Sequence, residues 1–186
     1  METSSHSRLF LSNFAGTMRK ALFTLLMLSL SALAQAQIAK KDWQLPSVTI
    51  KTIDGKSINT DELNNDGKPM IVSFWATWCK PCVLELSTIA ETYEEWQEET
   101  GVKVIAISID DARNISKVQP FVNGKDWDFE VYLDPNGDLK RAMNVNTVPH
   151  TFLFNGAKEV VYQHNSYAPG DEQYLYGKVK ELVGKK

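Results

Sequence analysis

Cysteine is scarce in this 186-residue chain, which contains only Cys79 and Cys82. Structural zinc sites usually need a second pair of ligands, and with no third cysteine that pair is missing. Long apolar runs are also missing, since the longest, residues 21–33, is shorter than the roughly 20 apolar residues that cross a membrane. Basic charge is not in excess, because 20 Lys and Arg residues face 23 Asp and Glu residues and give a net charge of −3. We therefore expect no basic stripe for nucleic acid.

The N-terminus has the layout of a secretory signal peptide. A basic start at residues 18–20 precedes the apolar run, and the small residues Ala34 and Ala36 fit a cleavage site. We therefore expect residues 1–36 to be a signal peptide and residues 37–186 to form the exported domain. Met18 offers an alternative start, which would make residues 1–17 an overlong N-terminus. A membrane anchor is the other interpretation of the run, and its length favours the cleaved signal.

Strands alternate with helices along the rest of the chain. Residues 70–75 and 102–109 are predicted as buried strands, with an amphipathic helix between them from Cys79 to Gly101. The Asp54-Gly55 turn predicts a hairpin. Further helices are predicted within 111–124, at 138–143 and at 171–183, and further strands at 129–133, 151–154 and 159–163. This order predicts an α/β fold with a mixed central sheet and helices on both faces.

The two cysteines form a C-x-x-C motif at the predicted start of a helix. A bridge between them would close a very short loop and add little stability, which favours a redox centre over a structural staple. The attacking species is the thiolate, and the free amide groups of a helix N-terminus stabilise it. We therefore predict that Cys79 is the exposed nucleophile and Cys82 the buried resolving cysteine. Lys80 adds a positive charge that favours the thiolate, and Pro81 fits a first helical turn.

The stretch from Phe74 to Cys82, with Trp78 directly before the first cysteine, resembles the active-site segment of the thioredoxin superfamily. It is most similar to the exported branch typified by TlpA and ResA. Residues 54–56 and 66–69 resemble the N-terminal extension of that branch, and residues 110–133 resemble its inserted helix and strand. The resemblance covers residues 45–183. It implies a thioredoxin fold with an N-terminal β-hairpin and a central helix-strand insertion.

The resemblance also implies a role for Val148, Pro149 and His150, because this segment matches the one that carries the cis proline of the family. Pro149 would be cis and face the disulfide. The backbone of Val148 would pair with an incoming chain as an added strand, and His150 would lie in the same substrate groove. From the residues alone, a trans proline at the start of a strand is the ordinary alternative.

One position departs from the thioredoxin pattern. Cytoplasmic thioredoxins have a buried Asp in the central strand that moves protons to and from the buried cysteine, and Ser73 occupies that position here. Glu85 lies three residues after Cys82, one helical turn further along on the same face. The ResA-like branch has an acid at this position, so the resemblance implies that Glu85 is the proton relay. The alternative is an ordinary surface glutamate on the helix.

Together these features imply thiol–disulfide exchange on protein disulfides in the periplasm or another extracytoplasmic compartment. The resemblance favours a reductase that serves cytochrome c maturation or disulfide repair and receives electrons from a membrane donor of the CcdA or DsbD type. No organic cofactor or metal is required, and a monomer is expected.

Two alternatives stay open at this point. One is a disulfide oxidase or isomerase, since the sequence does not fix the direction of exchange. The other is a copper-binding or copper-delivery protein, because Cys79, Cys82 and His150 could hold Cu(I). The remaining histidine of the exported domain, His164, is expected in a solvated loop after a strand.

Overall fold

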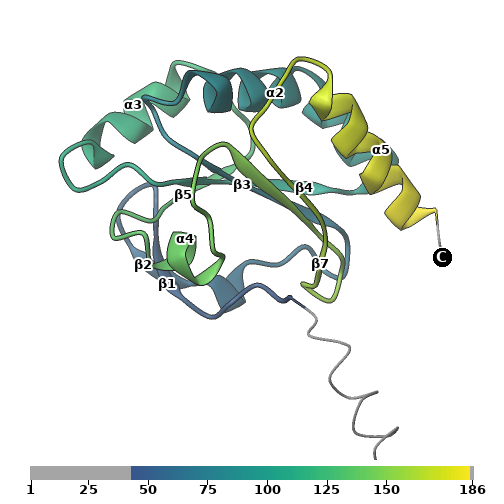
Figure 1. Ribbon diagram of the computed structural model, residues 1–186, viewed down its shortest axis with the longest axis horizontal. Helices are drawn as coiled ribbons and strands as arrows, with labels where there is room; N and C mark the ends of the chain where they lie inside the picture. The colour runs from purple at the N-terminus through teal and green to yellow at the C-terminus, as the bar shows by residue number, and fades with distance from the viewer. Residues whose placement is uncertain (1–42, 185–186) are drawn as a thin grey trace, which may run out of the picture. The chain divides into compact units, whose positions relative to one another are not determined.

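The structure of the protein, a computed structural model, describes residues 43–184, so the predicted signal peptide lies outside the described residues. The strands are β1 (Thr49–Thr52), β2 (Ser57–Asn59), β3 (Met70–Trp75), β4 (Lys103–Ser108), β5 (Glu130–Leu133), β6 (His150–Phe154) and β7 (Val160–Asn165). The helices are α2 (Lys80–Thr100), α3 (Val118–Asn123), α4 (Asp138–Ala142) and α5 (Asp171–Val183), with short 3₁₀ turns η1 (Thr60–Glu62) and η2 (Ile115–Lys117). Within residues 43–184, the strands form one sheet in the order β2-β1-β5-β4-β3-β6-β7 (Figure 1).

The sheet is mixed, as predicted. Strands β3, β4 and β5 are parallel neighbours, and the remaining neighbours pair antiparallel. Parallel neighbours need a long crossover connection, and α2 and α3 lie in the two crossovers. Strand β3 is covered on both faces, since all six of its residues are buried. This explains why its sequence is a nearly continuous apolar run rather than an alternating one.

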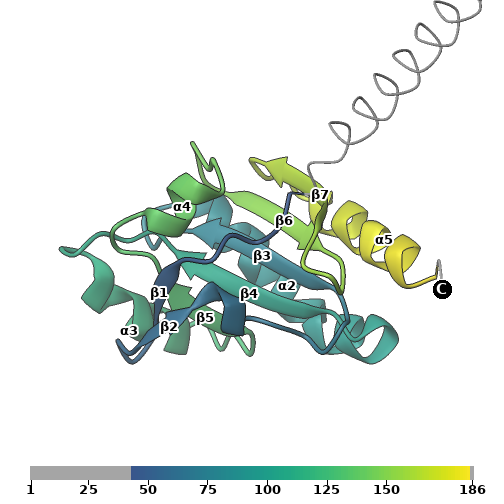
Figure 2. The same cartoon turned by 90° about the horizontal axis from the view of Figure 1, so that it is seen from below.

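Helices cover both faces of the sheet, which confirms the predicted α/β class. Helices α2, α3 and α5 lie on one face and α4 on the other (Figure 1, Figure 2). Successive side chains of β3 point to opposite faces. On one side, Trp75 belongs to the same core cluster as Leu86 of α2 and Leu175 of α5. On the other side, Phe74 belongs to a cluster with Leu139 of α4.

Helix α2 carries the cysteine motif and ends where the sequence predicts. Cys79 is its N-cap, and Gly101 ends it in the left-handed conformation (φ 67°) that glycine adopts without steric cost. Trp96 on its apolar face stacks on Tyr176 of α5, with ring centroids 4.6 Å apart. The buried residues of the helix recur at helical spacing: Cys82, Glu85, Leu86, Ile89, Tyr93 and Trp96. Neither α2 nor any other helix between residues 43 and 184 combines the length and apolar character needed to cross a membrane.

The two expected additions to the thioredoxin core are present. The hairpin of β1 and β2 turns at Gly55, whose amide donates to the Thr52 carbonyl at 2.9 Å. Strand β1 then pairs antiparallel with β5, which follows α3 and pairs parallel with β4. The N-terminal hairpin and the helix-strand insertion therefore extend the same edge of the sheet and leave the opposite edge to β6 and β7.

Candidate active site

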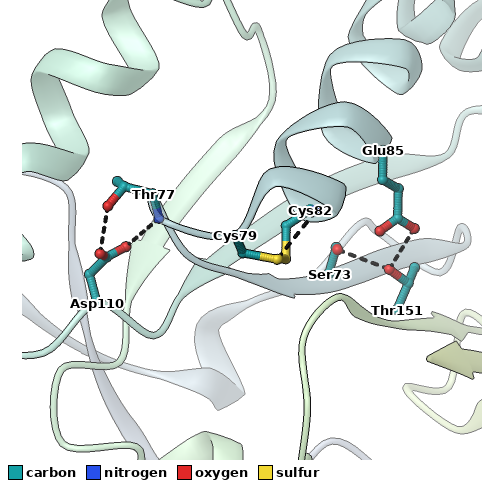
Figure 3. The surroundings of a disulfide bond; sticks show 7 residues. All are labelled: Ser73, Thr77, Cys79, Cys82, Glu85, Asp110 and Thr151. Carbon is teal, nitrogen blue, oxygen red and sulfur yellow. Dashed lines mark hydrogen bonds between the residues drawn. A yellow bond between two sulfur atoms is a disulfide. The ribbon is translucent and has the colours of Figure 1, made fainter. Parts of the chain in front are cut away.

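A disulfide joins Cys79 to Cys82 at the N-terminus of α2, after the short loop that follows β3 (Figure 3). The Cys82 amide N–H donates to Cys79 Sγ at 3.3 Å. This donor and the positive end of the helix dipole are placed to stabilise negative charge on Cys79 once the bond opens.

The two sulfurs differ in access, although less than the sequence predicts. Cys79 retains 5% of its surface and Cys82 retains none. Both residues belong to the core cluster beneath α2, which explains why even Cys79 is largely covered. Cys79 is therefore the cysteine that retains exposed surface, although it is also largely buried.

The other residues of the motif lie at the surface. Trp78 is 63% exposed, and Lys80 and Pro81 are also exposed. Pro81 sits in the first turn of α2, where no helical hydrogen bond is lost. An aromatic ring and a positive charge thus flank Cys79, where they can meet an incoming substrate.

The Val148–Pro149 peptide bond is cis, the conformation that the resemblance implied. Pro149 is buried directly before β6, and Val148 is half-buried. Strand β6 runs antiparallel to β3, with His150 paired opposite Phe74. The start of β6 therefore lies at the end of β3 from which α2 departs, so the cis-proline segment and the disulfide share one end of the sheet.

Glu85 is buried, with 1% of its surface exposed, so it is not an ordinary surface glutamate. Its Oε1 accepts a hydrogen bond from Thr151 Oγ1 at 2.9 Å and lies 2.9 Å from His164 Nε2. Thr151 Oγ1 also lies 2.9 Å from Ser73 Oγ (Figure 3). A hydroxyl has a single proton, so Ser73 donates to Thr151 and Thr151 donates to Glu85. The second carboxyl oxygen of Glu85, Oε2, is buried and has no hydrogen-bond partner among the described residues.

His164 lies in β7 and not in the solvated loop that the sequence predicts. Strand β7 continues to Asn165, two residues beyond its predicted end, because pairing with β6 extends to His150 and Asn165. Alternate residues of a strand share a face, so His164 points to the same side as Tyr162, which packs on the cluster under α2. The period-two spacing from Tyr162 to His164 is the signal in the sequence that indicates this orientation.

Asp110 is a buried site residue that the sequence analysis missed. It is 1% exposed and lies two residues after the end of β4. Its carboxylate accepts hydrogen bonds from the Thr77 amide at 2.9 Å and from Thr77 Oγ1 at 2.7 Å (Figure 3). It also accepts one from Ser108 Oγ at 2.9 Å. Asp110 thereby fixes the loop between β3 and Cys79. The sequence did offer one signal, because Asp110 directly follows the predicted strand 102–109. The carboxyl end of that strand lies beside the carboxyl end of β3.

His150 lies at the start of β6, but its ring turns away from α2. The imidazole stacks on Phe152 with ring centroids 4.4 Å apart, and its Nε2 lies 2.9 Å from Gln163 Oε1. Phe152 belongs to the cluster on the opposite side of the sheet from Thr151 and Glu85. Within residues 43–184, no three His, Cys, Asp or Glu side chains are grouped to hold a metal ion. The structure therefore does not bring His150 together with the two cysteines as a copper site would require.

Comparison with known proteins places this site in a family. The AhpC/TSA family matches residues 42–163, more than half of the chain. The chain belongs to the AhpC/TSA family. One protein similar to it is thiol-disulfide oxidoreductase ResA of Oceanobacillus iheyensis, which is 32% identical over 127 residues, or 67% of this chain and 63% of that protein. The chain thus spans less than two thirds of the length of that relative.

Two further proteins are similar to this AhpC/TSA family member. Sporulation thiol-disulfide oxidoreductase A of Bacillus subtilis is 29% identical over 147 residues, which are 76% of this chain and 87% of that protein. The solution structure of an uncharacterized thioredoxin-like protein from Porphyromonas gingivalis has a TM-score of 0.69 and 52% identity, and covers 76% of this chain and 92% of that one. The predicted thioredoxin fold is therefore confirmed.

Proposed function

We propose that the protein is an extracytoplasmic thiol–disulfide oxidoreductase that reduces disulfide bonds in other proteins. The observation that carries the proposal is the Cys79–Cys82 disulfide at a helix N-terminus, in which Cys79 alone retains exposed surface. A structural bridge of this span would contribute little stability. The similarity to two proteins named as thiol-disulfide oxidoreductases supports the same activity.

The first half of the reaction takes place at Cys79. In the reduced protein its thiolate attacks one sulfur of a substrate disulfide, a bond forms between Cys79 Sγ and that sulfur, and the other substrate sulfur leaves as a thiolate. The Cys82 amide and the dipole of α2 stabilise the Cys79 thiolate before the attack. The exposed Lys80 beside it favours the same charge.

The second half takes place at the buried Cys82 and needs a base. The Cys82 thiol loses its proton and attacks Cys79 Sγ, so that the protein disulfide forms and the second substrate sulfur leaves as a thiolate. Two electrons pass to the substrate and one proton leaves the protein. We assign the base role to Glu85, because it lies one helical turn from Cys82 and its Oε2 is a buried acceptor without a hydrogen-bond partner in residues 43–184.

The substrate chain would lie between Trp78 and the Val148–Pro149 segment. Trp78 directly precedes Cys79 and is 63% exposed. In this arrangement the backbone of Val148 would bind the substrate as an added strand. A substrate bound in this way would present an extended peptide around its disulfide.

After each reaction the Cys79–Cys82 disulfide must be reduced again, so the protein needs an electron donor as a partner. The predicted signal peptide places the reaction in the periplasm or another extracytoplasmic compartment, where structural disulfides persist. A membrane donor of the CcdA or DsbD type would return the two electrons. Cytochrome c maturation and disulfide repair are two processes that such a reductase would serve.

Cysteine variants test the exchange reaction directly. With a disulfide-bonded protein as substrate, and with each variant reduced beforehand and then freed of reductant, Cys79→Ser should abolish reduction, and Cys82→Ser should accumulate substrate bound to Cys79 as a mixed disulfide on a non-reducing gel. Substrate trapped by Cys79→Ser instead would reverse the assigned roles. Failure of both variants to trap substrate would contradict the proposal.

A matched pair of glutamate variants tests the base. Glu85→Gln should slow reduction by about 10²-fold, the lower end of the range for general base catalysis. Glu91→Gln, on the exposed face of the same helix, should leave the rate unchanged. Equal rates for the two variants would remove Glu85 from the mechanism.

A further inference from the structure

A row of polar side chains crosses the face of the sheet that packs against α2, where apolar side chains would be expected. Strand pairing sets Ser73 of β3 opposite Thr151 of β6, and Thr151 opposite His164 of β7. Directly paired residues of neighbouring strands share a face, so the three side chains point the same way. Ser73 and Thr151 are fully buried, whereas the His164 side chain is 15% exposed. The row thus runs from the interior of the sheet to solvent.

Glu85 of α2 lies on this row and meets two of its members at one oxygen. Oε1 accepts from Thr151 and lies 2.9 Å from His164 Nε2. Thr151 and Ser73 are hydroxyls that continue inward and end in the core. Among the partners of Glu85 within residues 43–184, His164 is therefore the one acid–base group and the one that reaches water. Among the residues that the structure describes, a proton on Glu85 has a connected exit only through this imidazole.

We propose that His164 is a positioning residue that passes the proton of Glu85 to solvent during the second half of the exchange reaction. The proposal rests on the base role assigned to Glu85 above. As Cys82 attacks Cys79, the thiol proton moves to Glu85, and Glu85 delivers it to His164 Nε2. The imidazole then releases one proton to water from its outer nitrogen, and Glu85 returns to the carboxylate. The Cys79–Cys82 bond forms, the bond from Cys79 to the substrate sulfur breaks, and that sulfur leaves as a thiolate.

The other titratable groups around the pair do not offer a second route. Tyr162 is the neighbour of His164 on β7, with ring centroids 5.8 Å apart, and Tyr167 follows the strand. Burial raises the pKa of both phenols, so both stay protonated in the working range and cannot take a proton from Glu85. The remaining charged or titratable groups near the two phenols are Asp171, Glu172, Tyr174 and Lys178, all in α5.

A purely structural role for His164 is the competing explanation. In that case the imidazole would only hold the carboxylate in place through its hydrogen bond. His164→Gln separates the two roles, because an amide N–H can still donate to Glu85 but cannot accept and release a proton. His164→Thr leaves space beside Glu85 for free imidazole, and its β-branched side chain suits a strand.

The test measures the lifetime of the mixed disulfide. Reduced full-length protein is mixed with oxidised glutathione, the reaction is stopped with acid at intervals, and mass spectrometry separates the Cys79–glutathione adduct from the closed Cys79–Cys82 form. We expect His164→Gln and His164→Thr to prolong the adduct about tenfold or more. Free imidazole should restore fast closure in His164→Thr and should not restore it in Glu85→Gln. Val161→Thr, an exposed change on the same strand, is the control and should behave as wild type.

Each other result is decisive. If the adduct closes at the wild-type rate in both His164 variants but slowly in Glu85→Gln, the proton route through His164 is wrong and the base role of Glu85 stands. If it also closes at the wild-type rate in Glu85→Gln, both the proton route and the base role are wrong. Slow closure in His164→Thr that imidazole does not restore would assign His164 a structural role only.

Discussion

Asp110 offers the sharpest test of how the active-site loop is held. Replacing it with Ala removes the acceptor of three hydrogen bonds, two from Thr77 and one from Ser108. A buried donor without an acceptor costs about 1–3 kcal/mol. The two hydroxyls can rotate toward other acceptors, but the Thr77 amide cannot move. We therefore expect Asp110→Ala to lower the free energy of unfolding by about 2–4 kcal/mol.

Asp110→Asn is the informative partner of that variant. Its amide oxygen can accept from the Thr77 amide, while its NH₂ group donates to Thr77 Oγ1, which then serves as acceptor. All the buried groups remain paired, and the cost should be only about 1 kcal/mol, the difference between a charged and a neutral acceptor. Thr77→Val, which removes the hydroxyl alone, should cost about 1–2 kcal/mol for the same reason.

Urea unfolding of the oxidised proteins at neutral pH, followed by tryptophan fluorescence, measures these free energies. The order Asp110→Ala, then Thr77→Val, then Asp110→Asn is the expected ranking of the losses. If Asp110→Asn costs as much as Asp110→Ala, the negative charge rather than the hydrogen-bond geometry holds the loop, and the reasoning is wrong. A loss below about 0.5 kcal/mol for Asp110→Ala, within ordinary surface variation, would refute it altogether.

Three further predictions concern packing, acid stability and substrate contact. Gly156→Ala should destabilise the fold by about 1–3 kcal/mol, because its Cβ would lie 2.0 Å from the Gly67 carbonyl oxygen. Gly177→Ala should stabilise the fold by about 0.5–1 kcal/mol, because Gly177 lies within α5 and its Cβ would meet no atom within 4 Å. Thermal unfolding of the two variants compares these effects. Burial opposes ionisation of Glu172, but hydrogen bonds from Tyr167 and the Gly170 amide outweigh it and hold the pKa of Glu172 below its usual value of 4.5. A carboxyl with a lowered folded-state pKa adds stability above its unfolded pKa and loses it as the pH falls, so the advantage of wild type over Glu172→Gln should shrink from neutral pH to about pH 3 in urea unfolding; an advantage independent of pH would contradict this. Trp78→Ala should weaken the reduction of a protein disulfide several-fold while leaving the reaction with glutathione nearly unchanged, and equal losses in the two assays would place Trp78 in the chemistry rather than in substrate contact.

The elements around the disulfide could be predicted because their signals are local. Helix α2 begins beside Cys79 and ends at Gly101 as predicted, since a helix N-cap and a left-handed C-cap are properties of a few adjacent residues. Strand β3 matches its predicted bounds of 70–75, because a short apolar run covered on both faces is unmistakable in the sequence. The resemblance then supplied the cis peptide bond before Pro149, which the residues alone did not favour.

The polar contacts at the site could not be predicted because they join residues far apart in the chain. Asp110 reaches Thr77 across two parallel strands, and its place directly after a predicted strand does not show which way its carboxylate turns. The predicted strand that contains Tyr162 ended two residues too early, so His164 was assigned to solvent rather than to Glu85. Strand ends depend on how far the neighbour pairs, and here β6 extends the pairing to Asn165.

The most direct test of the account is the equilibrium redox potential of the Cys79–Cys82 pair in defined thiol buffers, with the fluorescence of Trp75 and Trp78 as the readout. A protein-disulfide reductase fed by a membrane donor should have a potential near or below about −270 mV, the value of thioredoxin. A potential near about −120 mV, the value of DsbA, would contradict a reductase and indicate an oxidase or isomerase. A pair that does not cycle at all would contradict the exchange reaction itself.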